Sequence, residues 1–173
     1  MRFAERNGTA IDVYQAATQM TDESGQAYPQ TIDKLLDNAV GPLGYYGAFI
    51  ANVHTDSAQS EVSDAIIASA KARGVPVVSG LQMLQWLDGR NASSFDSLAW
   101  SHNILSFHIS VEGGADGLEA MIPLDSRAGE LTDLSCNGKP VAHSTQTIKG
   151  VQYAIFAAAA ATCKADYSSL KTE

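Results

Sequence analysis

The chain has 173 residues, of which 19 are acidic and 11 are basic, so its formal net charge at neutral pH is -8. Because surfaces that bind phosphate need clustered Lys and Arg, and the basic residues here are scattered, this composition argues against nucleic acid and anionic membranes as partners. The longest apolar run, residues 154–161, is shorter than the roughly 20 residues of a membrane span. The charged first six residues lack the apolar segment of a signal peptide.

Strand and helix patterns alternate along the first 89 residues. Residues 9–15 are predicted to form a short buried strand, and residues 18–26 a polar loop. Residues 46–54 are almost entirely apolar, which is typical of a strand covered on both faces, as in a parallel sheet. The alternation of strands with helices at this spacing favours parallel βα units. The other elements expected here are helices at 29–39, 60–72 and 81–87 and a strand at 75–78.

After Arg90 the pattern changes to the alternation of apolar and polar residues that is typical of half-buried strands. Asn137-Gly138 is predicted to form a hairpin turn, because a type I′ turn needs positive φ at both central residues. About seven short strands with regular turns indicate an antiparallel immunoglobulin-like β-sandwich over residues 93–173. Since residues 1–92 are expected to form a partial (β/α) barrel-like unit, the predicted fold class is α/β plus all-β. The strands expected in the sandwich lie near 98–100, 104–111, 118–124, 131–136, 140–148, 151–157 and 162–167.

The two cysteines, Cys136 and Cys163, both lie in predicted strands of the second domain. Neither has the spacing of a zinc site. They either form a disulfide or remain two separate buried thiols, and the sequence favours neither alternative.

Three segments of the first half carry a resemblance to a known family. Residues 48–56 contain an apolar run that leads to His54, residues 71–79 contain a glycine followed by a hydrophobic strand pattern, and residues 82–84 begin a helix. In this order they resemble the last third of the barrel of polysaccharide deacetylases (the NodB-homology family). Residues 94–167 resemble the β-sandwich that follows such barrels in large secreted bacterial carbohydrate-active proteins. The resemblance implies a polysaccharide or oligosaccharide ligand and a secreted or extracellular parent protein.

The chain departs from this family at the metal site. The family uses an Asp-Asp pair and a His-x-x-x-His motif, and neither occurs in this sequence. We therefore expect no metal ligands and no cofactor. A barrel has to close to remove its strand edges, so an open piece is expected to cover them by forming a homodimer or by packing on the sandwich.

His54 is the first candidate for catalysis, because it ends a predicted strand, where α/β folds place their sites. In the family that the chain resembles, the matching His is the general acid that protonates the leaving group. The catalytic carboxylates expected beside it are Asp12, Asp22, Glu23 and Asp56, which lie in or after predicted strands.

Gln15, Tyr45 and Tyr46 are the candidates for binding the substrate, the tyrosines by stacking on sugar rings. These residues predict a carbohydrate-active hydrolase, either a glycosidase or deacetylase-like, that cleaves a glycosidic or acyl bond of a polysaccharide. The alternative is a non-catalytic carbohydrate-binding or structural module derived from a truncated polysaccharide deacetylase.

Overall fold

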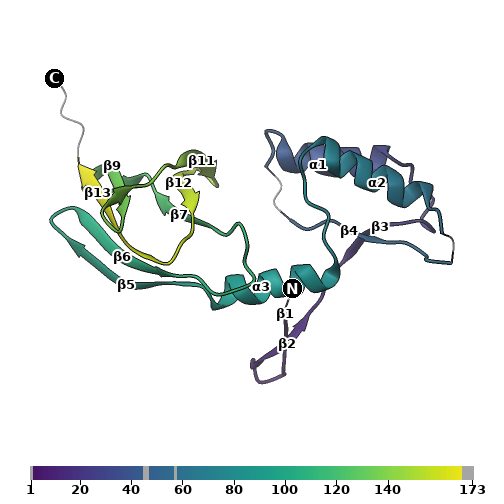
Figure 1. Ribbon diagram of the computed structural model, residues 1–173, viewed down its shortest axis with the longest axis horizontal. Coiled ribbons are helices and arrows are strands. Elements are labelled where there is room, and N and C mark those ends of the chain that lie inside the picture. Colours follow the sequence, from purple (N-terminus) through teal and green to yellow (C-terminus); the bar gives the residue numbers. More distant parts are fainter. Residues whose placement is uncertain (1, 45–46, 57, 169–173) are drawn as a thin grey trace. The chain divides into compact units, whose positions relative to one another are not determined.

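The computed structural model describes residues 2–44, 47–56 and 58–168, and these are mostly β with three helices (Figure 1). The contacts divide the chain into two units, Met1–Ser79 and Gly80–Glu173. Helix α3 (Gly80–Ala92) belongs to the second unit. The boundary expected between residues 92 and 93 falls at the end of this helix, and it stays a prediction. None of the helices in the described ranges is long and apolar enough to cross a bilayer.

The first unit contains one parallel strand pair. Strand β3 (Thr18–Thr21) pairs with β4 (Ile50–Asn52), and helix α1 (Gln30–Val40) lies between them in the chain. Helix α2 (Glu61–Ala72) follows. The unit is therefore a βαβ arrangement with one further helix, and parallel strands require such a crossover because a short turn cannot join them.

The core of this unit lies between β3 and the two helices. Met20, Ile32, Leu36, Ile66 and Ala70 are buried, with exposed fractions of 9% or less. The helical spacing of the apolar residues places them on one side of α1 and α2, as amphipathic helices require.

Polar contacts also join the two helices. Asp33 of α1 accepts hydrogen bonds from the buried hydroxyl of Ser69 and from Arg73 Nη1, the latter at 2.9 Å. Arg73 Nε donates to Asp37 Oδ1 at 2.8 Å. One guanidinium at the end of α2 thus binds two carboxylates that are one helical turn apart on α1.

Strand β2 (Ala10–Tyr14) corrects the expectation of a buried strand at residues 9–15. It pairs antiparallel with β1 (Arg2–Ala4) as a two-stranded hairpin, and Val13 is 51% exposed. The apolar residues of β2 stay accessible because only one strand flanks it.

Two further expectations for this unit are wrong, and a third holds only in part. The expected loop at 18–26 contains β3, and residues 75–78 form no strand, with Val77 and Val78 more than half exposed. In the described part of the apolar run at 46–54, residues 47–54, only Ile50–Asn52 is a strand, and Ala51 and Asn52 are exposed rather than covered. Short apolar runs are ambiguous because pairing partners, which the pattern does not specify, decide whether they become strands.

The second unit contains two antiparallel sheets. The six-stranded sheet has the order β10-β9-β13-β6-β5, with β8 paired to β9, and the three-stranded sheet has the order β11-β12-β7. The strands are β5 (Ser94–Ser101), β6 (Ile104–Ser110), β7 (Glu119–Pro123), β8 (Asp125–Ser126), β9 (Gly129–Cys136), β10 (Lys139–Pro140), β11 (Ser144–Ile148), β12 (Val151–Ala157) and β13 (Ala161–Ser168).

Both sheets contribute to one core. Phe107 of β6 and Ala165 of β13 are buried in the same cluster as Ile122 of β7 and Phe156 of β12. Along β13 buried and less buried residues alternate, as expected for a strand with one face in the core. Tyr167 also joins the sheets, since its hydroxyl donates to the carbonyl oxygen of Pro123 at 2.8 Å.

Cys136 and Cys163 form a disulfide between β9 and β13. They are direct cross-strand partners in the antiparallel register. The structure thus decides between the two alternatives that the sequence leaves open.

Two-residue turns close the hairpins of this unit. Asn137 and Gly138 both have positive φ, 51° and 74°, which confirms the predicted turn between β9 and β10. His102 and Asn103 adopt the same region between β5 and β6, with φ of 50° and 65°. That second turn carries no glycine, which is why the sequence pattern did not single it out.

Helix α3 is held closely against the loop at residues 112–116. A Cβ at Gly89 would lie against the carbonyl oxygen of Gly113 and 2.7 Å from the amide nitrogen of Ala115. Trp86 Nε1 donates to the carbonyl oxygen of Asp116 at 3.1 Å. The absence of a side chain at Gly89 is therefore what allows this approach.

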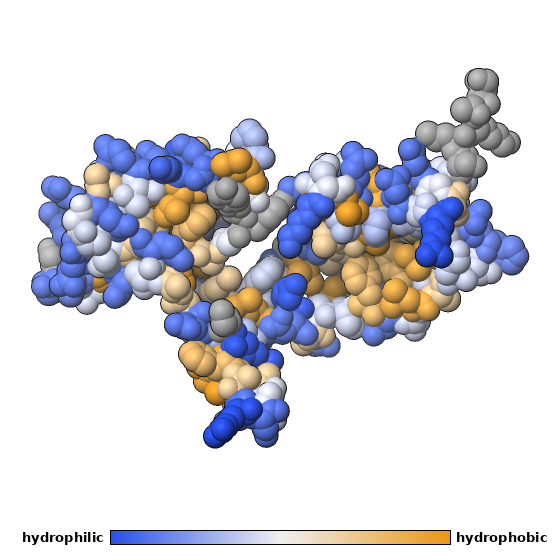
Figure 2. Space-filling model, turned by 180° about the vertical axis from the view of Figure 1, so that it is seen from behind, coloured by the Kyte–Doolittle hydropathy of each residue, from blue (hydrophilic) through white to orange (hydrophobic). Residues whose placement is uncertain are grey.

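Apolar side chains also reach the surface (Figure 2). On β5, Leu98 and Trp100 are 63% and 50% exposed. Trp100 still packs on Tyr167, with ring centroids 5.4 Å apart. Single exposed apolar residues are normal on soluble proteins, so these carry no functional argument on their own.

Candidate functional site

The candidate site lies at the carboxyl ends of the parallel strands β3 and β4. Asp22 directly follows β3, and His54 lies two residues beyond the end of β4. The register pairs Thr21 with Asn52, so both strands end at the same edge. This edge is where α/β units commonly place ligand-binding and catalytic groups, because the loops that leave the strands converge there.

The carboxylate of Asp22 accepts hydrogen bonds from both the ring and the backbone of His54. His54 Nδ1 lies 3.1 Å from Asp22 Oδ1 and 3.2 Å from Oδ2. The backbone N–H of His54 donates to Asp22 Oδ2 at 3.0 Å. Because a carboxylate only accepts, Nδ1 carries the proton of this hydrogen bond, and the other ring nitrogen is available for exchange.

Two more acidic residues act on this imidazole. Glu23 Oε1 lies 3.6 Å from His54 Nε2, and the negative charge of Asp56 also acts on the ring. Asp22 is 24% exposed at its side chain, whereas His54 is 52% and Glu23 is 74% exposed. The carboxylate of Asp22 is thus partly shielded from solvent, whereas the imidazole of His54 is open to it.

The interaction between His54 and Asp22 shifts the pKa values of both residues. The hydrogen bond to Asp22, followed by the charges of Asp22 and Glu23, raises the pKa of His54. The hydrogen bond from the backbone N–H of His54 is the largest cause that lowers the pKa of Asp22. The pair is therefore biased toward imidazolium and carboxylate, which is the ionisation that a general acid with an orienting carboxylate needs.

A hydrogen-bonded turn positions Asp22. The Ser24 hydroxyl donates to the carbonyl oxygen of Thr21 at 2.8 Å, and Thr21 Oγ1 lies 3.3 Å from Asp22 Oδ1. Gln26 Oε1 accepts from the Tyr28 hydroxyl at 2.9 Å, while Gln26 Nε2 donates to the carbonyl oxygen of Gln19 at 3.0 Å. Such side-chain bonds to nearby backbone stabilise turns, so these residues position the carboxylate.

Sequence reasoning did not assign these positioning residues. Gln19 also accepts the backbone N–H of Ile50 at 2.7 Å through its side chain, which links β3 to β4. The dense run of polar residues between Thr18 and Gln26 is the signal that could have indicated an ordered turn.

The other predicted site residues lie on different elements or outside the described ranges. Asp12 is on the β1–β2 hairpin, where its carboxylate lies 3.8 Å from Arg2 Nη2 and is 76% exposed. Gln15 directly follows that hairpin. Tyr45 and Tyr46 lie outside the described residues. The structure thus brings His54, Asp22, Glu23 and Asp56 together and places Asp12 on another element.

The donor set does not fit the metal site that the deacetylase resemblance implies. Of the two ring nitrogens of His54, Nδ1 is bonded to Asp22, and the sequence has neither of the two ligand motifs that the resemblance implies. Within the described ranges, no group of three or more His, Cys, Asp and Glu side chains is arranged to hold a metal ion.

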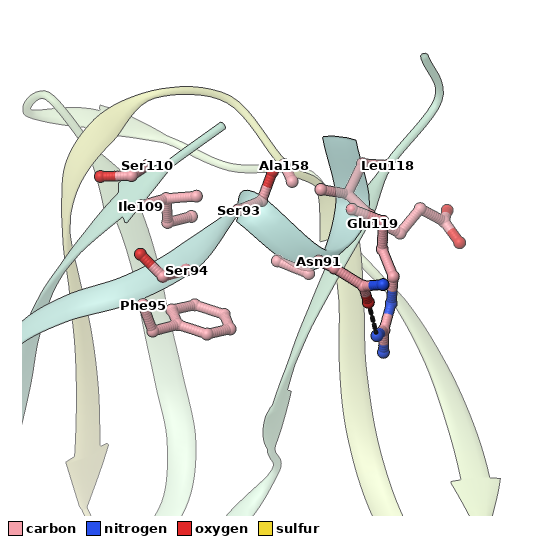
Figure 3. A pocket seen from close by; sticks show the side chains of 11 residues that line it. Asn91, Ser93, Ser94, Phe95, Ile109, Ser110, Leu118, Glu119 and Ala158 are labelled. Carbon is pink, nitrogen blue, oxygen red and sulfur yellow. Dashed lines mark hydrogen bonds between the residues drawn. The ribbon is translucent and has the colours of Figure 1, made fainter. Parts of the chain in front are cut away.

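A separate hollow of about 290 Å³ lies in the second unit (Figure 3). It is formed where the end of α3, the start of β5, the end of β6 and the start of β7 meet. Its lining residues are Arg90, Asn91, Ser93, Ser94, Phe95, Ile109, Ser110, Leu118, Glu119, Ala120 and Ala158.

Comparison with known proteins gave no match: no protein-family model, no curated protein and no solved structure is significantly similar to this chain.

Proposed function

We propose that the chain is a carbohydrate-active hydrolase that cleaves a glycosidic or acyl bond of a polysaccharide, with His54 as its general acid. The observation that carries this proposal is that Asp22 accepts hydrogen bonds from both the ring and the backbone of His54. A carboxylate that fixes Nδ1 orients the imidazole and stabilises its protonated form, as in hydrolases that use a His-carboxylate pair.

In the proposed step, His54 Nε2 gives its proton to the leaving-group oxygen of the substrate. The attacking water gives a proton to one of the neighbouring carboxylates, Glu23 or Asp56, as its oxygen bonds to the reacting carbon. Asp22 keeps its hydrogen bond to Nδ1 throughout. The bond to the leaving group breaks as its oxygen is protonated, so charge and atoms balance without a cofactor.

The resemblance to the end of a polysaccharide deacetylase barrel supports a polysaccharide as the substrate. The same resemblance supports an immunoglobulin-like sandwich as the class of the second unit, in which two antiparallel sheets share a core. The Cys136–Cys163 disulfide supports a secreted location, because disulfides persist in oxidising compartments.

The test is hydrolysis of chitin, xylan and cellulose oligomers, with released acetate and new reducing ends both measured. We expect His54→Ala to lose at least about a hundredfold in rate, as removal of a general acid does. His143→Ala is the matched control, since His143 is exposed in the second unit. Wild-type protein that releases neither product, or a His54→Ala variant with full activity, would contradict the proposal.

A non-catalytic carbohydrate-binding module is the second candidate. The observation that favours it is the high exposure of His54 and Glu23, since an open surface can bind sugar hydroxyls without excluding water from a reaction. Binding of the same oligomers without any product release would favour this candidate over the hydrolase.

A further inference from the structure

We propose that the hollow lined by Phe95 and Arg90 in the second unit is a carbohydrate-binding site that holds one pyranose ring of an oligosaccharide. The choice of sugar as the ligand class rests on the proposed function, whereas the location rests on the lining of the hollow alone. The site is separate from the His54 cluster in sequence and in its elements.

The floor and wall of the hollow are apolar. Ile109 and Ala120 are buried, with exposed fractions of 4% and 6%, and Leu118 and Ala158 lie beside them. The ring of Phe95 is 41% exposed and is supported from behind by Phe107 in an edge-to-face contact, with centroids 5.5 Å apart. A fixed, half-exposed aromatic ring is a suitable surface for the apolar face of a sugar.

The rim offers both donors and acceptors of hydrogen bonds. Arg90 donates only, Glu119 accepts only, and Asn91 does both. Arg90 Nη1 donates to Asn91 Oδ1 at 3.0 Å, and this hydrogen bond is the dashed line at Asn91 in Figure 3. Sugar hydroxyls both donate and accept, so they suit this mixture better than a simple anion, which the carboxylate of Glu119 would repel.

Side-chain hydrogen bonds hold the walls of the hollow in place. The Ser93 hydroxyl donates to the carbonyl oxygen of Gly89 at 2.8 Å and accepts the backbone N–H of Glu112 at 3.0 Å, which ties the end of α3 to the loop after β6. The hydroxyls of Ser94 and Ser110 both lie within 3.1 Å of Asp96 carboxylate oxygens. Fixed walls reduce the ordering cost of binding.

The size of the hollow limits the ligand. Its volume of about 290 Å³ lies just below the range of about 300–1,000 Å³ for small-molecule sites. We therefore expect it to hold a single ring, with the rest of the oligosaccharide outside it.

The experiment measures binding of cellohexaose, xylohexaose and chitohexaose to the whole chain by calorimetry. A His54→Ala background prevents turnover during the titration. We expect one of these oligomers to bind, Arg90→Gln to weaken that binding about tenfold, and Phe95→Leu to weaken it by a similar factor while keeping an apolar side chain. Arg127→Gln, an exposed arginine outside the hollow, is the matched control and should bind like the parent.

Three results would overturn the inference. One is that none of the oligomers binds, and another is that Arg90→Gln and Phe95→Leu both bind like the parent. The third is that Trp100→Leu, on the exposed part of β5, abolishes binding while Phe95→Leu does not. Loss of hydrolysis in the His54→Ala variant with retained binding separates this site from the proposed catalytic site, because each can fail without the other.

Discussion

The carboxylate of Asp22 accepts two hydrogen bonds from His54, one from ring atom Nδ1 at 3.1 Å and one from the backbone N–H at 3.0 Å. The two residues are 32 positions apart in the sequence. They meet because β3 and β4 are parallel neighbours and end at the same edge. The orientation of His54 therefore depends on Asp22, which is also the largest cause of the raised pKa of the imidazole.

Replacing Asp22 should lower the pKa of His54. In Asp22→Asn the ring loses its charged partner, so we expect the pKa of His54 to fall toward the ordinary value of about 6.5. Titration of the imidazole proton signals by NMR measures this shift. Asp12→Asn is the matched control, because Asp12 lies on the β1–β2 hairpin. An unchanged pKa in Asp22→Asn would refute the pairing.

The same pair predicts a pH window for the stability of the first unit. The lowered pKa of Asp22 contributes stability above its unfolded-state pKa of about 3.9, and this is lost as pH falls through the lowered value. The raised pKa of His54 contributes stability below about 6.5, and this is lost as pH rises through the raised value.

The contribution of the pair is thus largest between about pH 4 and 6.5. Amide hydrogen exchange in α2, compared between wild type and Asp22→Asn across this pH range, measures how much the pair contributes to the stability of the first unit. The difference should shrink at both ends of the window. A difference that does not change with pH would show that Asp22 acts through packing rather than charge.

Adding a methyl group at Gly89 should destabilise the second unit. The new Cβ would meet the backbone of Gly113 and Ala115, which cannot rotate away as a side chain can. We expect Gly89→Ala to lower the free energy of unfolding by on the order of 2 kcal/mol. Urea unfolding followed by tryptophan fluorescence measures this unit, because Trp86 and Trp100 both belong to it.

Gly80 provides the control on the same helix. A Cβ there meets no atom within 4 Å, so Gly80→Ala should be neutral or slightly stabilising. Equal effects of the two substitutions would mean that helix propensity, and not the close approach of α3 to the loop, determines the outcome.

Reduction of the Cys136–Cys163 disulfide should also destabilise the second unit. The bond closes a loop with a sequence separation of 27 residues, and its loss should lower the free energy of unfolding by about 3.5 kcal/mol through the entropy of the unfolded chain. Unfolding of the wild type with and without dithiothreitol measures the effect. The Cys136→Ser, Cys163→Ser double variant should unfold like the reduced wild type and should not respond to the reductant.

Local patterns were sufficient to predict much of the structure. The helical spacing at residues 29–39 and 60–72 corresponds to α1 and α2, and the period-two alternation after Arg90 corresponds to the antiparallel strands. The Asn137-Gly138 turn was predictable because few residues adopt positive φ at two consecutive positions. In each case the signal lies within a few neighbouring residues.

The pairing of distant segments was decided only by the tertiary structure. The polar residues of β3 look like a loop, and they form a strand because β4 lies beside them. That pairing selects Asp22, and not Asp12, as the partner of His54, and the register of β9 with β13 selects the disulfide over two separate thiols. The sequence determines which segments can form strands and helices, because propensity and periodicity are local. Which segments become neighbours depends on how apolar surface is buried over the whole unit, and local patterns do not carry that information.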